Sequence, residues 1–444
     1  EAPEHPMILR DAIHGLVTFE SEEDAIVTRL LATSEVQRLR RIRQLGLTSF
    51  AFPGAEHTRF SHAIGAAHVM KLFLARLRQI DGDLPFWQRV TSERARDAIA
   101  AAFLHDLGHG PLSHLFEEAL PGALHHEAWT ERILLDPSSE VHRVLVADDP
   151  YLPQRVADLV KGKHSLPYLA KAVSGTFDVD RCDYLLRDAY ATGVGYGHYD
   201  LPWLLRSLRF DDSASSGRAS SAGPGLAIDG DKGIAAIEAF LLARNFMFQQ
   251  VYFHKSTRSA EWMIGAILRR AVAQLRDGTR LPALPPGFTE IAGGDLPTLG
   301  QYLELDDQVL LCAIHAWEEG PDPVLADLCK RLRRRALFKT IELFPERDAA
   351  EGAPGIEPAA ALGIAQEIAR AGGLDPDVYV GLDQASDTPY ADDDSLTVVF
   401  PRGRPRRPSE VSFLLARLRG ETITRSRVIF APELREAMRE ALIR

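Results

Sequence analysis

With 444 residues and 45% hydrophobic content, the chain can bury a large core and hold two or three domains, which excludes a disordered protein. A net charge of −11 argues against general affinity for nucleic acid, although a local basic patch is compatible with it. Three cysteines without CxxC spacing disfavour a disulfide framework or zinc ribbon. No apolar run approaches the roughly 18 residues of a membrane span, so we expect a soluble, cytoplasmic protein.

The first hundred residues predict a hairpin followed by helices. Alternation around Gly15, within residues 10–19, is typical of a short hairpin. Helical periodicity then runs from Ala25 to Leu47, and the arginines at 38, 40, 41 and 43 form either a solvated face or a phosphate-binding cluster. The stretch 57–62 leads into a helix that reaches Leu77, and a proline-containing connector covers residues 84–92.

The most informative stretch is His105-Asp106, at the end of an apolar run over residues 98–104. Gly108 and Pro111 stop the helix just after this pair. A buried aspartate without a partner is costly, and both side chains could converge on one divalent ion, because imidazole and carboxylate are ordinary metal ligands. An isolated pair of this kind is commonplace, but eight of the fifteen histidines lie between positions 57 and 126. This density predicts a metal site at the helix end.

The pair His126-Glu127 stands at the start of a helix that we expect to reach Leu135. A glutamate in the first turn compensates the helix dipole without any catalytic role. Alternatively, its carboxylate positions the histidine as an acid or base. The sequence leaves both interpretations open.

Four aspartates crowd into residues 178–188. Asp180, Tyr184 and Asp188 stand at i, i+4 and i+8, so a helix would aim all three at a common target. In the alternative interpretation, the aspartates form ordinary surface ion pairs with the arginines of the same stretch.

The second half of the chain predicts long helices, a linker and a final α+β segment. Residues 213–225 are rich in Ser, Ala and Gly and predict a loop, and residues 276–296 form a Pro/Gly linker. The other predicted elements are a helical stretch over 233–275, helices over 298–318 and 323–341, strands over 396–400 and 428–430, a basic loop over 402–407, and a helix from Pro432.

Four residues flanked by apolar helix, His62, His105, Asp106 and Asp180, resemble the H…HD…D signature of the HD-domain phosphohydrolases. The surrounding stretches are similar to one branch, the deoxynucleoside triphosphate (dNTP) triphosphohydrolases related to the sterile-alpha-motif and HD-domain protein of animals and to bacterial dGTPase-like enzymes. These stretches span residues 8–345 and comprise 11–15, 36–46, 52–62, 105–116, 126–127, 178–188, 243–255 and 305–307.

The resemblance implies a mainly α fold. Its HD-domain helical core, with small β-hairpins, would occupy residues 1–275, and a C-terminal helical or α+β lobe would occupy residues 276–444. The relatives are usually oligomers, so we expect a homo-oligomer, either a dimer or a tetramer.

The resemblance also implies a role for each matching residue. The metal ligands would be His62, His105, Asp106 and Asp180, and the ion would be Mn, Fe, Ni, Co, Zn or Mg. The catalytic residues would be His126, steadied by Glu127, and His109, which faces the triphosphate. The substrate-binding residues would be Gln44, Leu45, Arg59, His114, Arg181, Tyr184, Asp188, Arg244, Tyr252 and His254; within this set Arg59 and His114 would hold phosphate, and Gln44, Tyr184 and Asp188 would read the sugar.

These roles imply metal-dependent hydrolysis of dNTPs to a deoxynucleoside and inorganic triphosphate. A triphosphate needs a cation and several arginine or histidine donors, which this set supplies. Two positions depart from relatives that a guanine nucleotide activates, with Ala32 in place of an acidic residue and Met7 in place of a basic one. Activation at that site is therefore not expected, while another nucleotide activator stays open.

Two alternatives remain. The same scaffold could act on single-stranded nucleic acid, a nucleoside monophosphate or an alarmone, and the basic loop over 402–407 would then engage the longer anion. Alternatively, the protein could be a non-catalytic nucleotide sensor. A sensor needs no acid, so the presence of His126-Glu127 beside all four ligands counts against it.

Overall fold

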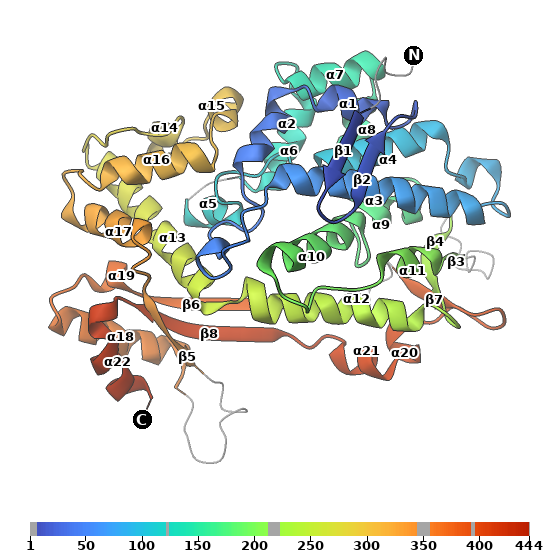
Figure 1. Ribbon diagram of the computed structural model, residues 1–444. Coiled ribbons are helices and arrows are strands. Elements are labelled where there is room, and N and C mark those ends of the chain that lie inside the picture. Colours follow the sequence, from blue (N-terminus) through green and yellow to red (C-terminus); the bar gives the residue numbers. More distant parts are fainter. Residues whose placement is uncertain (1–6, 121–123, 212–222, 344–355, 392–395, 444) are drawn as a thin grey trace.

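The computed structural model of the protein describes residues 7–120, 124–211, 223–343, 356–391 and 396–443. Helices dominate it, and its strands form one two-stranded and two three-stranded sheets (Figure 1). The predicted mainly α class, with small hairpins and a C-terminal α+β segment, is confirmed. Most of the loop predicted over 213–225 lies outside the described residues. None of the helices described is long and apolar enough to cross a membrane.

The chain opens with the predicted hairpin. β1 (Met7–Asp11) pairs antiparallel with β2 (Gly15–Phe19), and Gly15 takes a φ of +72° in the turn. The long helix predicted over 25–47 is wrong, because the segment breaks into α1 (Ala25–Leu30), α2 (Ser34–Arg38) and a 3-10 turn, η1 (Leu39–Arg41). Periodicity was correct for the buried face, but the chain must turn to bring Arg38 into the interior.

The four arginines of this segment make structural contacts, and Arg40 and Arg41 also lie on the solvated face that one alternative predicted. Arg38 is only 1% exposed, and none of the four lines the large cavity described below. Their contacts are Arg38 to the carbonyl oxygen of Leu305, Arg40 over the ring of Phe60, Arg41 with Asp306, and Arg43 with Glu56.

Three helices form the centre of the helical body: α3 (Arg59–Ile80) packs against α4 (Ser92–Leu104) and α10 (Val179–Thr192). Small residues permit the close approach, since a Cβ added at Gly65 would lie 1.9 Å from Asp183 Oδ1. The surrounding elements are η2 (Thr48–Phe50), η3 (Phe86–Gln88), α5 (His114–Ala119), α6 (His126–Leu135), α7 (Glu140–Asp148), α8 (Leu152–Val160), α9 (Pro167–Val173) and α11 (Leu201–Arg206).

Two long helices follow the body, and they confirm the helical stretch predicted over 233–275. They are α12 (Ile234–Met247) and α13 (Lys255–Arg276), joined by a π-helical turn, η5 (Phe248–Tyr252). π-turns interrupt a helix at an energetic cost and are frequent at functional sites. Here the turn directs aromatic side chains into the central cavity. Before α12 lie the strands β3 (Leu208–Asp211) and β4 (Gly225–Asp229).

The predicted C-terminal helices are shorter than expected. The helix over 298–318 is two helices, because Asp306 leaves the helical conformation and caps the second one. The helix over 323–341 ends at Arg333, since Arg335 has a φ of +54° and the chain continues as a strand. The elements are α14 (Phe288–Gly293), α15 (Leu299–Leu303), α16 (Asp307–Trp317), α17 (Pro323–Arg333), β5 (Lys339–Leu343), α18 (Pro358–Ala371), α19 (Pro376–Tyr379), β6 (Val380–Asp387), β7 (Thr397–Val399), α20 (Pro408–Val411), α21 (Phe413–Leu418), β8 (Ile423–Phe430), η6 (Pro432–Leu434) and α22 (Arg435–Leu442).

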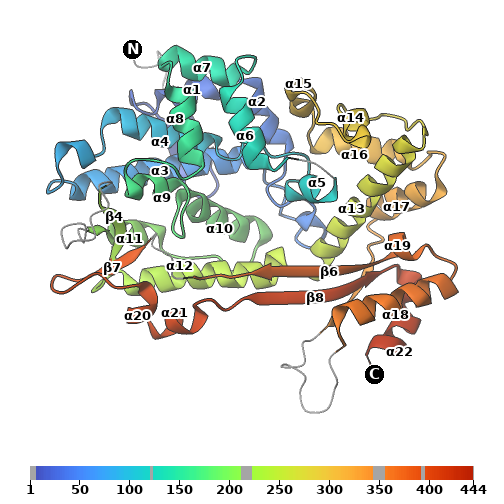
Figure 2. The same cartoon turned by 180° about the vertical axis from the view of Figure 1, so that it is seen from behind.

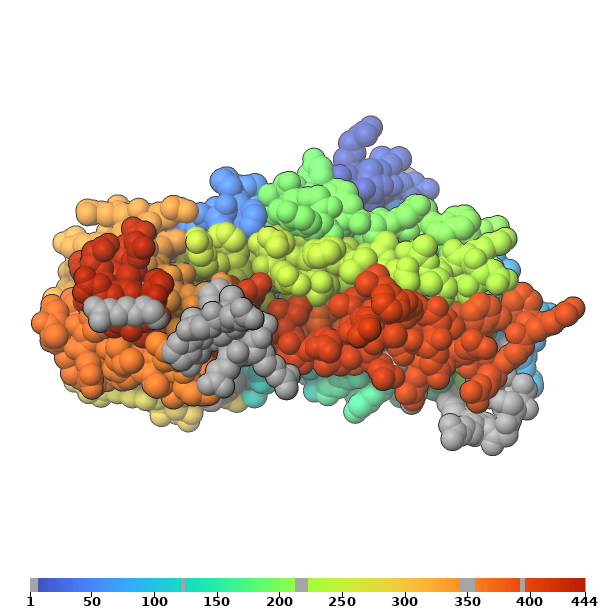
Figure 3. Space-filling model, turned by 90° about the horizontal axis from the view of Figure 1, so that it is seen from below, coloured from blue at the N-terminus to red at the C-terminus, as the bar shows by residue number. Residues whose placement is uncertain are grey.

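The last segment forms an antiparallel sheet of order β5-β8-β6, which confirms the strand predicted over 428–430. α18 and α22 pack on this sheet, and α13 contacts β5 and β6. In Figures 1 and 2 the strands β6 and β8 run below the end of α13. Seen from below, the C-terminal residues extend across the underside of the molecule (Figure 3).

The strand predicted over 396–400 is β7, and it adds in parallel to β4 in the sheet β3-β4-β7. This pairing joins residues 397–399 to residues 227–229, across the predicted domain boundary at residue 275. One hydrophobic core includes side chains from both sides of that boundary, and a second core lies between the C-terminal sheet and its helices. The division into two domains stays a prediction.

Candidate active site

The four predicted metal ligands meet where α4 ends. His62 comes from α3, His105 and Asp106 follow α4, and Asp180 comes from α10; we call these four residues the ligand cluster. His62 Nε2 lies 3.0 Å from Asp180 Oδ1 and 3.3 Å from His105 Nε2, and His105 Nε2 lies 3.3 Å from Asp106 Oδ1. Donor atoms that share one transition-metal ion stand about 3.0–3.5 Å apart. The spacing of His62, His105 and Asp106 fits such an ion, and Asp180 contacts both histidines, at 3.0 and 3.4 Å.

The far nitrogens of the two imidazoles fix their orientation. His62 Nδ1 donates to Asp183 Oδ2 at 2.8 Å, and His105 Nδ1 donates to the carbonyl oxygen of Ala102 at 2.9 Å. Each ring therefore presents its Nε2 to the cluster, in the arrangement that metal-binding histidines adopt. Two Nε2 lone pairs and two carboxylates that face one another need a cation between them, which supports a divalent metal here.

The carboxylates of the ligand cluster make it strongly attractive to positive charge. Burial lowers the pKa of His62, but hydrogen bonds with Asp180 and Asp183 outweigh it and raise this pKa to about 10. Burial is likewise outweighed at His105, where the charge of Asp106 and the contact with Asp180 raise the pKa to about 9. Protons and a metal ion compete for the same nitrogens, so metal binding must release protons.

Asp183 is an important residue that the sequence reasoning did not assign. It is fully buried, and besides His62 it accepts hydrogen bonds from Arg187 at 2.8 and 2.9 Å and from His14 Nε2 at 2.6 Å. These partners hold the pKa of Asp183 well below its usual range although burial raises it. The available signals were the spacing of Asp183 three residues after Asp180 and the position of His14 in a matching stretch.

A second group of side chains lies beside the ligand cluster, and we call His109, His114, Glu117 and His126 the histidine cluster. The rings of His109 and His126 stack with centroids 3.8 Å apart, and His109 Nε2 lies 3.2 Å from Asp106 Oδ1. Burial and the charge of Arg59 lower the pKa of His109 far below its usual value and that of His114 to about 4. Both rings are therefore neutral at pH 7.

The predicted pairing of His126 with Glu127 is wrong. Glu127 is exposed, whereas the two oxygens of Glu117 lie 3.2 and 3.3 Å from His126 Nδ1. Burial raises the pKa of Glu117, but the hydrogen bond from His126 outweighs it and lowers this pKa, so the carboxylate is ionised. Glu127 points away because successive helical side chains diverge by about 100°. The dyad is therefore His126 with Glu117, from the separate helix α5.

Arg59 is held against the ligand cluster by Ser113. Its Nε and Nη2 donate to Ser113 Oγ at 3.0 and 2.9 Å, and its Nη1 pairs with Asp106. Ser113 and Leu112 both have positive φ, at +61° and +55°, which costs about 1–3 kcal/mol each. Asp307 stabilises this conformation by accepting the backbone N–H of Leu112 at 2.7 Å. Ser113 and Asp307 both lie in matching stretches, but no sequence pattern indicated these roles.

Both clusters open into one cavity of about 460 Å³, a size ordinary for a small-molecule site. Predicted site residues in its wall are Gln44, Leu45, Arg59, Asp106, His109, His114, His126, Asp180, Tyr184, Asp188 and Tyr252. The wall also contains residues that the sequence reasoning missed, namely Gly46, Thr48, Leu112, Ser113, Leu115, Phe248, Phe253, Thr257, Arg258 and Glu261. The helical stripe Asp180, Tyr184 and Asp188 is confirmed as facing one cavity.

One side of the cavity carries a fixed carboxylate. Asp188 accepts hydrogen bonds from His57 Nε2 at 2.7 Å and from the Tyr252 hydroxyl at 2.8 Å, and it is 1% exposed. Nearby in the wall, Gln44 Oε1 is buried without a hydrogen-bond partner among the described residues. A buried carbonyl oxygen of this kind needs a donor, so a ligand with a hydroxyl or amino group would satisfy it.

Three residues implied as substrate contacts do not line this cavity. Arg181 is paired with Asp178, and Arg244 donates to the carbonyl oxygen of Pro389 at 2.9 Å. His254 caps α13 by accepting the N–H of Ser256. Their substrate roles stay predictions, and each side chain has a structural partner instead.

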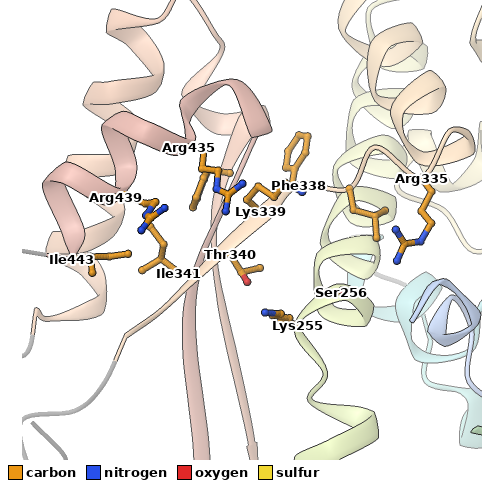
Figure 4. Close-up of a pocket in the computed structure, with 12 residues that line it drawn as sticks. Lys255, Ser256, Arg335, Phe338, Lys339, Thr340, Ile341, Arg435, Arg439 and Ile443 are labelled. Carbon is orange, nitrogen blue, oxygen red and sulfur yellow. The ribbon is translucent and has the colours of Figure 1, made fainter. Parts of the chain in front are cut away.

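A second cavity, of about 550 Å³, lies between the start of α13, the strand β5 and the helix α22 (Figure 4). Its charged lining residues are all cationic: Lys255, Arg335, Lys339, Arg435 and Arg439. Arg335 is already engaged, since it donates to the carbonyl oxygen of Phe50 at 2.7 and 2.9 Å. The described wall contains no carboxylate, so this cavity fits a polyanion.

A metal-ligand cluster, a histidine–carboxylate dyad and a buried arginine in one cavity define a metal-dependent phosphohydrolase. Residues 59–188 match the family model described as HD domain, and residues 200–283 match that described as HD associated region. The chain is 36% identical over 386 residues to the uncharacterized protein YwfO of Bacillus subtilis (strain 168), covering 86% of this chain and 80% of that one. The chain belongs to the HD-domain phosphohydrolases.

Solved and named relatives extend this comparison. A phosphohydrolase from Bacteroides thetaiotaomicron superposes with a TM-score of 0.77 at 26% identity, covering 96% of this chain and 100% of that one. The chain is 24% identical over 376 residues to the deoxynucleoside triphosphate triphosphohydrolase SAMHD1 of Gallus gallus, covering 77% of this chain and 57% of that protein. The SAMHD1 homolog of Dictyostelium discoideum is 32% identical over 197 residues, covering 42% of this chain and 36% of its own length.

Proposed function

We propose that the protein hydrolyses deoxynucleoside triphosphates to a deoxynucleoside and inorganic triphosphate. The observation that carries this proposal is that Asp106 and Asp180 of the ligand cluster, His126 of the dyad and the buried carboxylate of Asp188 line one cavity. A nucleotide with its phosphates at the clusters and its sugar at Asp188 would satisfy all three. The distant similarity to the SAMHD1 proteins supports the same substrate class.

The reaction would be attack of water on the α-phosphorus, with cleavage of the bond to the 5′ oxygen of the sugar. A divalent ion, when bound, lowers the pKa of water and polarises a phosphoryl oxygen. Arg59, fixed by Ser113, would stabilise the negative charge that develops on the phosphate. His126 would transfer a proton to the departing 5′ oxygen, and Glu117 would stabilise the imidazolium before that transfer.

The sugar end of the cavity supports a nucleoside triphosphate over a simple phosphate ester as the substrate. Asp188 has both oxygens engaged by His57 and Tyr252, so its position is fixed before the substrate arrives. A fixed acceptor suits the 3′-hydroxyl group, and the free Gln44 Oε1 offers an acceptor to a second donor group of the nucleoside. The base would then lie against Phe248, Phe253 and Thr257, whose side chains favour no particular base.

The test is product identification with each dNTP, each ribonucleotide and a single-stranded oligonucleotide, in Mn²⁺ and in Mg²⁺. In ¹⁸O-labelled water, the label should appear in the inorganic triphosphate and not in the nucleoside. Label in the nucleoside, or release of pyrophosphate, would contradict attack at the α-phosphorus. Shortened oligonucleotides would select nucleic-acid hydrolysis, and binding without turnover in either metal would select a nucleotide sensor.

We also propose that the basic cavity in Figure 4 receives any nucleotide activator. Its five cationic residues and the lack of carboxylates in its described wall support a phosphate-bearing ligand. dNTP turnover measured with each added nucleotide tests this. Activation that persists in Lys339→Ala combined with Arg435→Ala would exclude the cavity.

A homo-oligomer, dimer or tetramer, is proposed as well. Ile8 and Leu16 lie on neighbouring strands of the hairpin and are each 55% exposed, although both are apolar. Light scattering after size exclusion gives the mass directly. A monomeric mass of 49.1 kDa at every protein concentration would contradict the expectation.

A further inference from the structure

We propose that the histidine cluster is a second metal site, which takes a zinc-type transition-metal ion and thereby inhibits the enzyme. One potential ligand atom from each of His109, His114, Glu117 and His126 lies within 4.8 Å of the others. Three imidazoles and one carboxylate are the donors that zinc and its neighbours prefer, whereas Mg²⁺ selects oxygen. The inhibitory consequence rests on the proposed function, but the binding itself does not.

Two unsatisfied atoms point to a cation at this place. His109 Nδ1 and Glu117 Oε1 are both buried and make no hydrogen bond among the described residues, since His126 Nδ1 bonds to the other oxygen of Glu117. They lie 4.0 Å apart. His109 donates from Nε2 to Asp106 Oδ1, so its Nδ1 carries a lone pair toward the carboxylate. An ion about 2.0–2.2 Å from each atom spans this gap and removes the repulsion between two acceptors.

The other two histidines complete the donor set from different directions. His126 Nδ1 lies 3.2 Å from Glu117 Oε1. The ring of His114 is nearly perpendicular to those of His109 and His126, at 83° and 75°, with centroids 5.0 and 5.1 Å away. Although neighbouring side chains surround much of the His114 ring, the residue keeps an exposed surface through which an ion can reach the cluster.

Binding of this ion would disable the dyad. The rings of His109 and His126 now stack within 14° of parallel. An imidazole binds metal with a lone pair in its ring plane, so two stacked rings must tilt apart to share one ion. The ion would also replace the proton between His126 Nδ1 and Glu117. His126 would then be displaced and unable to protonate the leaving group, while the ligand cluster keeps its own metal.

The test counts bound ions on the full chain. Protein loaded with Mn²⁺ is dialysed against buffered free Zn²⁺ over a rising series, and bound metal is measured by mass spectrometry. We expect the wild type to bind two ions per chain. As the free zinc concentration is lowered, the ion in the histidine cluster should dissociate first. His114→Ala should weaken that second site by more than the roughly 10- to 100-fold that loss of an outer-sphere partner costs. His105→Ala should lose the first site and keep the second.

Two controls keep the outcome interpretable. His198→Ala removes an exposed histidine elsewhere and should bind two ions like the wild type. Glu117→Gln, which preserves size, should bind one ion and melt near the wild-type temperature. A second ion that persists in both His114→Ala and Glu117→Gln would overturn the proposal, as would a single ion on the wild type at saturating zinc.

Activity distinguishes this inference from the proposed function. With Mg²⁺- or Mn²⁺-supported turnover, zinc inhibition should follow the same midpoint as occupancy of the second site. Inhibition without a second ion would reflect exchange at the ligand cluster and would overturn the proposal. Two bound ions on a protein that turns over no dNTP would contradict the proposed function alone.

Discussion

The ligand cluster and the histidine cluster contain the same kinds of side chain and share a wall of one cavity, yet the chain holds them differently. In the ligand cluster, each imidazole donates from Nδ1 to a fixed acceptor, which is Asp183 for His62 and a backbone carbonyl for His105. In the histidine cluster, His109 Nδ1 has no partner among the described residues, and His126 Nδ1 meets the carboxylate of Glu117.

This difference indicates that the hydrogen bond made by Nδ1 of each imidazole, more than the residue type, determines whether a histidine binds metal or transfers a proton. A ring whose Nδ1 proton is held by a buried acceptor has only its Nε2 lone pair to offer, and it is suited to bind a metal. A ring paired with an ionised carboxylate at the cavity wall can gain and lose a proton, and it is suited to acid–base chemistry. The four predictions below test that distinction, from the largest expected effect to the smallest.

Removing a ligand should abolish both metal and turnover. In His105→Ala the ligand cluster loses one of two nitrogens, so we expect the metal bound at the ligand cluster, and dNTP hydrolysis with it, to fall below detection. Metal analysis after dialysis and product chromatography measure both. His198→Ala, at an exposed position, is the matched control and should keep both. Full activity in His105→Ala would remove the ligand cluster from the mechanism.

Removing the carboxylate of the dyad should lower turnover but leave metal binding at the ligand cluster unchanged. Glu117→Gln keeps the shape of the side chain but cannot stabilise an imidazolium, so we expect turnover to fall about 10²- to 10⁴-fold. His126→Ala should lose a similar factor, and both variants should keep the metal of the ligand cluster. Glu127→Gln is the matched control, because Glu127 is exposed and not the partner of His126. A larger loss in Glu127→Gln than in Glu117→Gln would restore the pairing expected from the sequence.

Weakening the hydrogen bond that orients the ligand His62 should lower metal affinity. Asp183→Asn can still accept the hydrogen bond of His62, but it lacks the negative charge, so we expect metal affinity to fall about 10- to 100-fold. Competition with a coloured chelator measures this. The control is Asp97→Asn, which removes another buried carboxylate, paired with Arg155 about two turns before His105. Equal losses of affinity in the two variants would show a general effect of instability.

The smallest expected effect is on how the stability of the folded protein depends on pH. His68 lies behind His14, the neighbour of Asp183, with ring centroids 5.1 Å apart. Burial and the charges of His14 and Lys71 lower the pKa of His68 to about 4 from its ordinary 6.5. Between pH 6.5 and about pH 4, the unfolded chain binds a proton at His68 that the folded protein does not bind. The stability contributed by neutral His68 is thus complete above pH 6.5 and is lost as the pH falls toward 4.

Replacing this histidine should remove its share of the pH dependence. The free energy of unfolding of His68→Gln, from urea titrations at several pH values, should fall less steeply than that of the wild type between pH 6.5 and pH 4. Parallel curves for the two proteins would exclude His68 as a source of the acid instability.

Local sequence patterns predicted part of the ligand cluster. His105-Asp106 ends an apolar helix, which predicted a metal site there, and Asp180 begins a helical stripe; the resemblance alone named His62 and Asp180 as ligands. The supporting residues gave no such signal. The contact between His14 and Asp183 joins positions 169 residues apart. Sequence periodicity carries no information on contacts of that range, so only the resemblance hinted at them.

The errors in the fold have a similar origin. The helix expected over 25–47 breaks because Arg38 reaches the carbonyl of Leu305, which lies 267 residues further along the chain. Periodicity reports which residues are buried but not where a buried polar group finds its partner. Glu117 was missed for the same reason: it lies on α5, and only the packing of α5 beside α6 brings it to His126.

The pairing of β7 with β4 has a consequence for how the molecule is made. β4 receives its parallel neighbour only from residues 397–399, and Arg258, in the cavity wall, is paired with Asp383 at 2.6 Å. Residues up to 399 must therefore leave the ribosome before β7 can pair with β4, and residues up to 383 before Arg258 can pair with Asp383. A nascent chain stalled before residue 397 would leave this edge of β4 exposed to other strands.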